Sequence, residues 1–280
     1  MHICLIGNNL TSIVLAKNLI NKKIKVSIFC EKTNRLNLPS KTIGISKKNF
    51  DFFERNIMKL KKNKIWHIKK IEIFNEKSQI EKILNFENNK KQLFTIVKDD
   101  IIYKSINDNL KKNSFLKKVN LNKNSFFKDI VKKKYNLIIN CDSNNFIAKN
   151  FFTKKIEKNY NSSAYTCIIR HKKIINRTAS QIFTKVGPLA FLPLSNLETS
   201  IVFSIRNNEE EITEKKFKEL INRYNKIYKI EKFSKINKFK LNSLNLRNYY
   251  HKNIMAFGES LHKIHPLAGQ GFNMTLRDIE

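Results

Sequence analysis

The last part of the chain carries the pattern that most restricts its fold. Residues 254–257 form a short apolar run typical of a buried strand, and this run stops at Gly258. Further on, Pro266 stands before Gly269 and Gly271, two residues without a side chain that let the backbone pass close to a bulky group. A helix is predicted to begin there, and the free N–H groups and positive dipole end of a helix N-terminus suit an electron-rich or anionic ligand. The pattern therefore predicts a strand, a turn and a helix that contact a ligand together.

The beginning of the chain predicts a second ligand-binding feature. Residues 2–6 form an apolar strand that ends at Gly7, and a helix with regularly spaced apolar positions follows. A second strand, residues 24–29, ends just before Glu31. A strand–helix–strand unit with an acid about twenty residues past its glycine turn is the layout of a dinucleotide site, in which the acid accepts ribose hydroxyls.

The glycine fingerprint of that unit is only partly present. Gly7, Asn9 and Ser12 stand at its three glycine positions. Asn tolerates left-handed backbone angles better than most residues, and Ser is small enough for fairly close packing of the helix on the strand. We therefore expect the site to survive with a looser grip on a pyrophosphate.

The terminal segment also carries a family resemblance. From Gly258 to Asp278 the chain reads G-E-S-L-H-K-I-H-P-L-A-G-Q-G-F-N-M-T-L-R-D. This pattern resembles the flavin-contacting segment of the FAD-dependent aromatic-ring monooxygenases, most closely those of ubiquinone biosynthesis. The resemblance implies that Glu259 lies at the ribityl chain of FAD. It also implies that the isoalloxazine ring is surrounded by Pro266, Gly269, Gln270, Gly271 and Asn273, and that the adenosine diphosphate half is held by Gly7, Asn9, Ser12 and Glu31.

Two more positions correspond to family sites, and each has a simpler alternative. Lys41 stands where the family has an arginine near the flavin, and a solvated lysine is the alternative. Asp142 ends the apolar strand 137–141, where the family usually has Asp-Gly supporting the FAD pyrophosphate and the approach of NAD(P)H. Ser143 replaces that glycine, and an aspartate that only caps the next turn is the alternative.

A second sheet is predicted in the middle of the chain. Residues 165–170, 182–184 and 200–205 read as antiparallel strands. The segment 187–194, G-P-L-A-F-L-P-L, resembles the family's strand on the substrate side of the isoalloxazine, and its apolar character suits an aromatic substrate. Its two prolines lack N–H donors, so we expect an edge or a kinked crossing and not a central strand. A basic amphipathic helix is predicted over 215–230.

These elements define the expected architecture. The fold class is α/β, with a Rossmann-like FAD-binding domain over residues 1–150 and 251–280. An inserted antiparallel-sheet substrate domain is expected over residues 151–250, with an additional strand near 66–75. Because family members usually continue beyond the helix that follows Gly271, the chain is expected to be C-terminally shortened, as a fragment, a reduced version or a shortened reading frame.

The charge of the chain does not by itself indicate a nucleic-acid partner. The 55 Lys and Arg residues exceed the 23 Asp and Glu residues, for a formal net charge of +32. The lysines are spread over helices and turns, and no nucleic-acid-binding motif accompanies them. Composition bias is the preferred interpretation, with weak attraction to a membrane surface as a by-product. No apolar stretch of membrane-spanning length and no signal peptide is recognised, so we expect a cytoplasmic protein, peripheral at most on the inner membrane face.

The reactive residue types do not form a catalytic group in the sequence. The four cysteines lack the C-x-x-C spacing and read as buried free thiols in a reducing compartment. No Ser-His-acid, paired-carboxylate or metal-ligand pattern is recognised, and a structural role is favoured for His262 and His265. We therefore expect no metal and no catalytic side chain, because in a flavoenzyme the cofactor carries the chemistry.

The resemblance implies a monooxygenase that uses FAD, NAD(P)H and O₂ to hydroxylate an aromatic compound, with a polyprenylated ubiquinone precursor as the expected substrate and other ubiquinone-biosynthesis proteins as possible partners. Three alternatives remain open. The chain is a degenerate flavoprotein fold that acts by binding alone, a basic binder of nucleic acid or anionic lipid, or a flavin reductase acting on isoprenoid chains.

Overall fold

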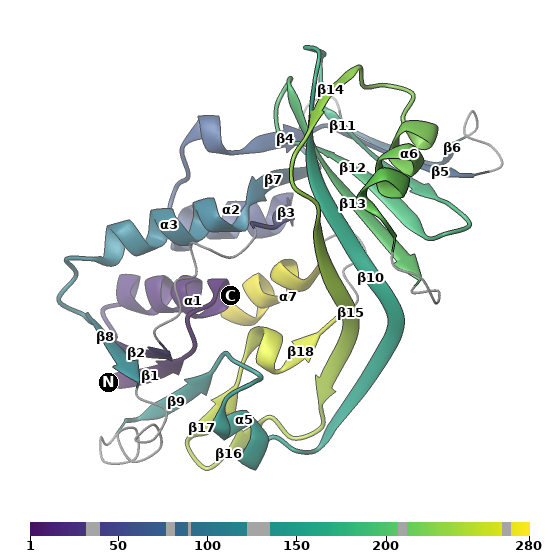
Figure 1. The fold of residues 1–280 in the computed structure, drawn as a ribbon. Coiled ribbons are helices and arrows are strands. Elements are labelled where there is room, and N and C mark those ends of the chain that lie inside the picture. Colours follow the sequence, from purple (N-terminus) through teal and green to yellow (C-terminus); the bar gives the residue numbers. More distant parts are fainter. Residues whose placement is uncertain (32–39, 77–81, 89–90, 122–134, 207–211, 265–269) are drawn as a thin grey trace. The chain divides into compact units, whose positions relative to one another are not determined.

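In the computed structural model the chain forms two compact units (Figure 1). The structure describes residues 1–31, 40–76, 82–88, 91–121, 135–206, 212–264 and 270–280. Unit 1 consists of residues 1–61, 98–158 and 242–280, and unit 2 consists of residues 62–97 and 159–241. Pro266 and Gly269 lie outside the described residues.

Unit 1 contains a mostly parallel sheet of six strands. The strand order is β16 (Tyr250–His251), β17 (Ile254–Ala256), β9 (Leu137–Asn140), β1 (His2–Ile6), β2 (Lys25–Glu31) and β8 (Leu116–Leu121). All neighbours run parallel except β16 and β17, which form a hairpin. The central strand β1 is apolar and almost fully buried, as expected for a parallel strand covered on both faces.

Helices and short elements complete unit 1. Their bounds are α1 (Leu10–Asn21), β3 (Thr42–Ser46), α2 (Lys47–Asn56), α3 (Asp99–Leu110), α5 (Phe146–Phe151), η3 (Gly258–Ser260), β18 (His262–Lys263) and α7 (Gln270–Ile279). Helix α1 packs against β2, α3 and α7, and this surrounds most of its side chains. The strand–helix–strand unit expected at the start of the chain is therefore present as β1, α1 and β2.

Unit 2 is built on an antiparallel sheet. Its path runs β15 (Asn237–Leu246), β10 (Lys155–His171), β13 (Glu198–Arg206), β12 (Pro188–Pro193), β11 (Thr178–Phe183), β5 (Lys70–Asn75) and β6 (Lys82–Glu87), and β14 (Ile230–Phe233) pairs with β10. The remaining elements are η2 (Lys62–Lys64), β4 (Trp66–Ile68), β7 (Phe94–Lys98) and α6 (Glu214–Tyr224). Strand β4 pairs with β7, and β5 runs parallel to β11.

The compact units have other bounds than the expected domains, whose roles in binding FAD and substrate stay predictions. Residues 62–97 belong to unit 2 as a whole, whereas only a strand near 66–75 was expected there. The reason is strand pairing, since β5 joins the sheet beside β11 and β6 then pairs with β5.

The expectation that 187–194 avoids a central position was wrong. Strand β12 pairs with β11 on one side and β13 on the other. Pro188 and Pro193 are its first and last residues, so the four residues between them supply the N–H groups of the ladder.

The helix expected over 215–230 is shorter than predicted. Helix α6 ends at Tyr224, because the side chain of Asn225 accepts hydrogen bonds from the N–H groups of Ile227 and Tyr228 and turns the chain there. After this turn the chain enters β14.

The sheet of unit 2 has two distinct faces. One face carries the core that packs on α6, through Phe203, Phe217 and Ile221 among others, and Figure 1 shows α6 lying along this sheet. The opposite face carries a row of half-buried side chains at paired positions on five neighbouring strands. This central row consists of Thr166, Val202, Ala190, Gln181 and Ile73.

Two further observations bear on the sequence predictions. All four cysteines are free and buried, as expected, and a reducing compartment stays a prediction. Among the residues that the structure describes, no helix is both long and apolar enough to cross a membrane. Attraction to a membrane surface stays a prediction.

Candidate functional site

The turn after β1 brings two of the predicted residues together. Gly7 has a φ of +121°, a region that favours glycine, and its N–H donates to the carbonyl of Phe29 at 2.9 Å. A Cβ placed on Gly7 would lie 3.3 Å from the Cβ of Asp142. The glycine therefore lets the β1–α1 turn approach the residue that follows β9.

Asn9 and Ser12 hold the start of α1 by a reciprocal capping box. The Asn9 side chain accepts a hydrogen bond from Ser12 N–H at 2.9 Å, and the Ser12 hydroxyl accepts one from Asn9 N–H at 3.1 Å. Asn9 Nδ2 also donates to the carbonyl of Cys141 at 2.5 Å. The φ of Asn9 is −109°, so the left-handed conformation considered for it does not occur. Asn9 occupies its position as a helix cap and as a link to β9.

This cap leaves two donors at the positive end of α1. Among the described residues, the N–H groups of Leu10 and Thr11 meet no hydrogen-bond acceptor. Together with the helix dipole they form the part of unit 1 best suited to a phosphate group.

The turn after β17 closes on the same helix start. Gly258 has a φ of +59°, and a Cβ there would lie 2.5 Å from Cγ2 of Thr11. The strand β17 is aligned with β9, and Phe257 N–H donates to the carbonyl of Asn140 at 2.9 Å. Glu259 follows Gly258 directly and is exposed. Its carboxylate is therefore presented to solvent from the turn that packs on α1.

Asn140 is a residue of this site that the sequence analysis missed. It is fully buried at the end of β9, and its Nδ2 donates to the carbonyl of Asp142 at 2.9 Å and to the hydroxyl of Ser260 at 3.4 Å. Its Oδ1 accepts from Asn145 Nδ2 at 2.6 Å. An asparagine at the end of an otherwise apolar run was the available signal, since a buried amide must find partners.

The structure gives Asp142 a structural partner as well as its place beside Gly7. Its Oδ1 accepts from the N–H of Asn144 at 2.9 Å, which is the turn-capping role named as the alternative. The neighbouring Cys141 is fully buried, and burial raises the pKa of its thiol, an effect that Asp142 reinforces. Cys141 is therefore a protonated packing residue and not a nucleophile.

The start of α7 has a different character. Among the described residues outside its own helix, a Cβ on Gly271 would meet no atom within 4 Å, and Gln270 is exposed. Asn273 instead anchors the helix: its Oδ1 accepts from Ser46 N–H and Asn49 Nδ2, both at 2.9 Å, and its Nδ2 donates to the carbonyl of Gly44 at 2.7 Å. The side chain of Asn273 is thus committed to β3 and α2, while Gly271 leaves open space.

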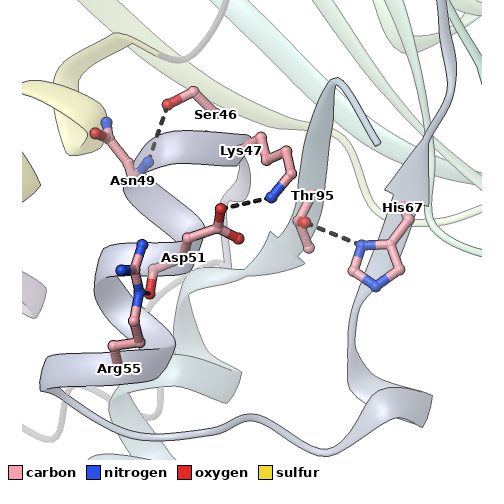
Figure 2. Close-up of polar contacts among 7 residues, drawn as sticks. All are labelled: Ser46, Lys47, Asn49, Asp51, Arg55, His67 and Thr95. Atoms are coloured by element: carbon pink, nitrogen blue, oxygen red, sulfur yellow. Dashed lines mark hydrogen bonds and ion pairs between the residues drawn. The ribbon is translucent and has the colours of Figure 1, made fainter. Parts of the chain in front are cut away.

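Asn49 and Ser46 were not recognised in the sequence as part of this arrangement. Ser46 caps α2 by accepting from Asn49 N–H at 3.4 Å, and in Figure 2 the two residues lie together at the start of that helix. Asn49 is almost fully buried, and its Nδ2 also donates to the carbonyl of Asn273 at 3.0 Å. Along the same helix, Lys47 pairs with Asp51 at 2.5 Å.

The two remaining predicted residues of unit 1 are Lys41 and Glu31. Lys41 is exposed, and its backbone N–H donates to Asp99 Oδ1 at 2.8 Å near the start of α3. Glu31 is the last residue of β2, and its side chain lies outside what the structure describes. The position of Lys41 at the surface agrees with a solvated lysine as well as with a site residue.

In the described ranges, no three or more His, Cys, Asp or Glu side chains lie together in a group that could hold a metal ion. His262 contacts Asp278 through Nε2 at 2.7 Å, so it ties β18 to α7. His265 lies outside the described residues.

Known structures share this architecture over the whole chain. PqsL of Pseudomonas aeruginosa, solved in complex with 2-aminobenzoylacetate, superimposes with a TM-score of 0.78 at 12% identity, covering 100% of this chain and 84% of PqsL. The p-nitrophenol 4-monooxygenase PnpA from Pseudomonas putida gives 0.76 at 8% identity, covering 99% and 77%. HpxO of Klebsiella pneumoniae, solved with FAD, gives 0.71 at 9% identity, covering 100% and 79%. These likenesses confirm the predicted fold, which is that of the FAD-dependent monooxygenases.

Sequence comparison gives a weaker signal. No protein-family model matches the chain. The ubiquinone biosynthesis monooxygenase COQ6 of Danio rerio, a mitochondrial protein, is 24% identical over a stretch that covers 51% of this chain and 38% of COQ6. The chain thus matches less than half the length of this relative.

Proposed function

We propose that the protein is an FAD-dependent monooxygenase that uses NAD(P)H and O₂ to hydroxylate an aromatic compound. The observation that carries this proposal is the convergence in unit 1 of Gly7, Asp142 and Gly258 on the start of α1. These residues come from three separate parts of the sequence, and two of them have backbone angles that favour glycine. The fold shared with FAD-dependent monooxygenases supports the same assignment.

The adenosine diphosphate half of FAD would lie at the start of α1. The N–H groups of Leu10 and Thr11 have no acceptor among the described residues, so they are available to a diphosphate. Glu31 ends the neighbouring strand β2, where an acid accepts ribose hydroxyls in sites of this layout. Asp142 and the exposed Glu259 flank the same helix start, and we assign them to the pyrophosphate and the ribityl chain respectively. Lys41 keeps its assignment beside the flavin.

The isoalloxazine ring would lie at the start of α7. Gly271 leaves room for a ring to approach the helix, and Gln270 is exposed beside it. The positive end of α7 would stabilise negative charge on the reduced ring. Asn273 acts by holding α7 in place, because its amide is bonded to β3 and α2. Pro266 and Gly269 are assigned to the surroundings of the ring because of the resemblance of the terminal motif to the family.

Bound FAD would supply hydride acceptance and oxygen activation. The protein therefore has to bind and orient the cofactor and the substrate, and to exclude water from them. We assign the aromatic substrate to the central row of the unit 2 sheet, on the face opposite α6. The small side chain at Ala190 and the polar groups of Thr166 and Gln181 give this row both room and hydrogen-bonding capacity. A complex of PqsL with 2-aminobenzoylacetate supports an aromatic substrate class.

We further propose a polyprenylated ubiquinone precursor as the substrate. The support is the similarity to COQ6, together with the terminal motif that most resembles the hydroxylases of ubiquinone biosynthesis. A product assay with quinone precursors that differ in ring substitution tests this narrower assignment independently of flavin binding.

One observation favours a second candidate, a protein with this fold that acts by binding alone. Asn9 stands at a position where the dinucleotide fingerprint has glycine, and its side chain lies between Ser12 N–H and the carbonyl of Cys141. A side chain there reduces the space through which a backbone approaches a pyrophosphate.

The visible absorbance of the purified protein separates the two candidates. Flavin bands that appear on adding FAD, are bleached by NAD(P)H and return in air are expected for the monooxygenase. A folded protein that takes up no FAD at concentrations far above those typical of flavoproteins would overturn the proposal. Far-ultraviolet circular dichroism on the same sample establishes that the protein is folded.

A further inference from the structure

A pocket of about 180 Å³ opens on the α6 side of the unit 2 sheet. Its walls come from β5, β11 and β12 and from the turn that follows α6. Because Ser180 and Phe191 are paired in the sheet and Phe191 belongs to the core beneath α6, the pocket lies on the face opposite the central row. It is therefore separate from the place assigned to the substrate.

Aromatic rings form most of the pocket wall: Phe74, Phe191, Tyr224 and Tyr228. Tyr228 stacks on Phe191, with ring centroids 5.8 Å apart at 24°. Its hydroxyl donates to Asn176 Oδ1 at 3.0 Å, and that of Tyr224 donates to a carboxylate oxygen of Glu76 at 2.8 Å. Both tyrosines are held by these bonds, so the wall is formed before any ligand arrives.

The turn that closes the pocket is equally fixed. Asn225 accepts hydrogen bonds from the N–H groups of Ile227 and Tyr228, at 3.2 and 2.9 Å, and its Nδ2 donates to the carbonyl of Tyr228 at 2.7 Å. The Asn225 side chain thus holds the turn through hydrogen bonds to residues of the turn itself. Lys226 lies in this turn, lines the pocket and is exposed, which places a positive charge at the mouth.

One polar side chain of the pocket wall makes no hydrogen bond within the described part of the protein. Ser180 is 6% exposed, lines the pocket and makes no side-chain hydrogen bond to any residue in the described part of the chain. Its oxygen is not one of the fully buried atoms left without a partner, so it keeps surface that water or a ligand can reach from the pocket. Ser180 therefore marks a position where a ligand atom that accepts or donates a hydrogen bond would be stabilised.

We propose that this pocket is a second binding site, specific for a single-ring aromatic acid. A cavity of 150 Å³ is enough to hold benzene, so the volume here suits one ring. The ring would lie between the aromatic side chains, a hydroxyl substituent would bond to Ser180, and the carboxylate would lie at the mouth near Lys226. This site is distinct from the proposed substrate position, because the two lie on opposite faces of the same sheet.

The test uses the full chain, with FAD added where it binds, and 4-hydroxybenzoate as the probe. Calorimetry and saturation-transfer NMR report binding, and the flavin spectrum reports any ligand that reaches the cofactor. We expect Ser180→Ala to weaken binding about fivefold, the effect of losing one hydrogen bond, and to affect unsubstituted benzoate less. Ser200→Ala is the matched control, since Ser200 is buried on the opposite face of the same sheet.

Charge reversal supplies an independent arm. Lys226→Glu is expected to weaken binding about fivefold, whereas Lys215→Glu, an equal charge change at the exposed start of α6, leaves it unchanged. Ser180→Leu fills the pocket and should abolish binding, with circular dichroism as the check on folding and Ser180→Ala as the milder variant.

Several results would overturn the proposal: no binding of the probe at millimolar concentration, equal affinity in Ser180→Ala and Ser200→Ala, or equal affinity in the two lysine variants. Binding that shifts the flavin spectrum and is insensitive to Ser180 would mean that the probe occupies the substrate position instead. All lining residues belong to unit 2, so the test remains valid if the protein takes up no FAD.

Discussion

Two glycines of the terminal motif, Gly258 and Gly271, differ in what surrounds them. A Cβ on Gly258 would approach Thr11 Cγ2 to 2.5 Å, and its φ of +59° is one that residues with a side chain rarely adopt. A Cβ on Gly271 would meet no atom of another described segment within 4 Å. The first glycine is therefore required by the packing of the protein itself, whereas no described residue packs on the second, which we assign to the ligand.

The largest expected effect follows at Gly258. Gly258→Val adds a side chain against the buried Thr11 in a left-handed backbone, and we expect the free energy of unfolding to fall by about 3 kcal/mol. Urea denaturation followed by circular dichroism measures it. Adding Thr11→Ser removes Cγ2 and should restore about 1 kcal/mol, because only the steric part is relieved. Full stability in the single variant would mean that the two segments are not in contact.

Gly271→Val is the counterpart at the open position. Without FAD the free energy of unfolding should change by less than about 0.5 kcal/mol, since a Cβ there meets no atom of another segment that the structure describes. The affinity for FAD should fall by about a hundredfold, because the branched side chain takes the space assigned to the ring. Fluorescence titration with FAD measures this. A variant that retains stoichiometric FAD contradicts the assignment of α7 to the isoalloxazine.

Asn9→Gly sharpens the comparison at the start of α1. The variant loses the bond from Asn9 to the carbonyl of Cys141, and we expect it to cost about 1 kcal/mol of stability. The same change opens the backbone to a pyrophosphate, so the affinity for FAD should rise about threefold. Thr213→Gly removes the comparable cap of α6 in unit 2 and should change stability alone. Equal FAD affinities for Asn9→Gly and the unaltered protein would show that Asn9 does not obstruct the site.

The smallest effect concerns Glu76 in unit 2. The backbone N–H of Lys185, assisted by the Tyr224 hydroxyl, holds the pKa of Glu76 below its ordinary value of 4.5. A carboxyl group whose pKa is lower in the folded state stabilises the protein above its unfolded pKa, and this contribution is lost as the pH falls through the folded value. Urea titrations between pH 6 and pH 3 should therefore show a slightly shallower loss of stability in Glu76→Gln. Identical pH profiles would exclude this contribution.

The fold could be predicted from the sequence because its main signals are local. The apolar runs of β1, β2, β9 and β17 and the long terminal motif each indicated their element directly. The position of β12 was misjudged, because the prolines that argued against a central strand are its two end residues. Pairing partners decide such a case, and they lie far away in the sequence.

The candidate site was predictable in its backbone and less so in its side chains. Gly7 lies in the turn where a glycine was expected, but the close approach of Gly258 to Thr11 was not predicted, because Gly258 was interpreted only as the end of a strand. The capping of α1 by Asn9 was not predicted, because Asn suits both a left-handed turn and a helix cap. Asn49 and Asn140 gave little warning in a chain rich in asparagine, and their importance depends on burial that only the fold reveals.

The amide of Asn273 has a consequence for how this chain tolerates substitution. Two of the partners described above are main-chain groups, the carbonyl of Gly44 and the N–H of Ser46, which every non-proline residue supplies. Side chains at those two positions can therefore change without removing these bonds to α7. The sequence contains 55 Lys and Arg residues. Hydrogen bonds to main-chain groups are kept when side chains are replaced by lysine or other residues favoured by such a composition. Substitution of Asn273, or of its side-chain partner Asn49, would in contrast remove hydrogen bonds that hold α7.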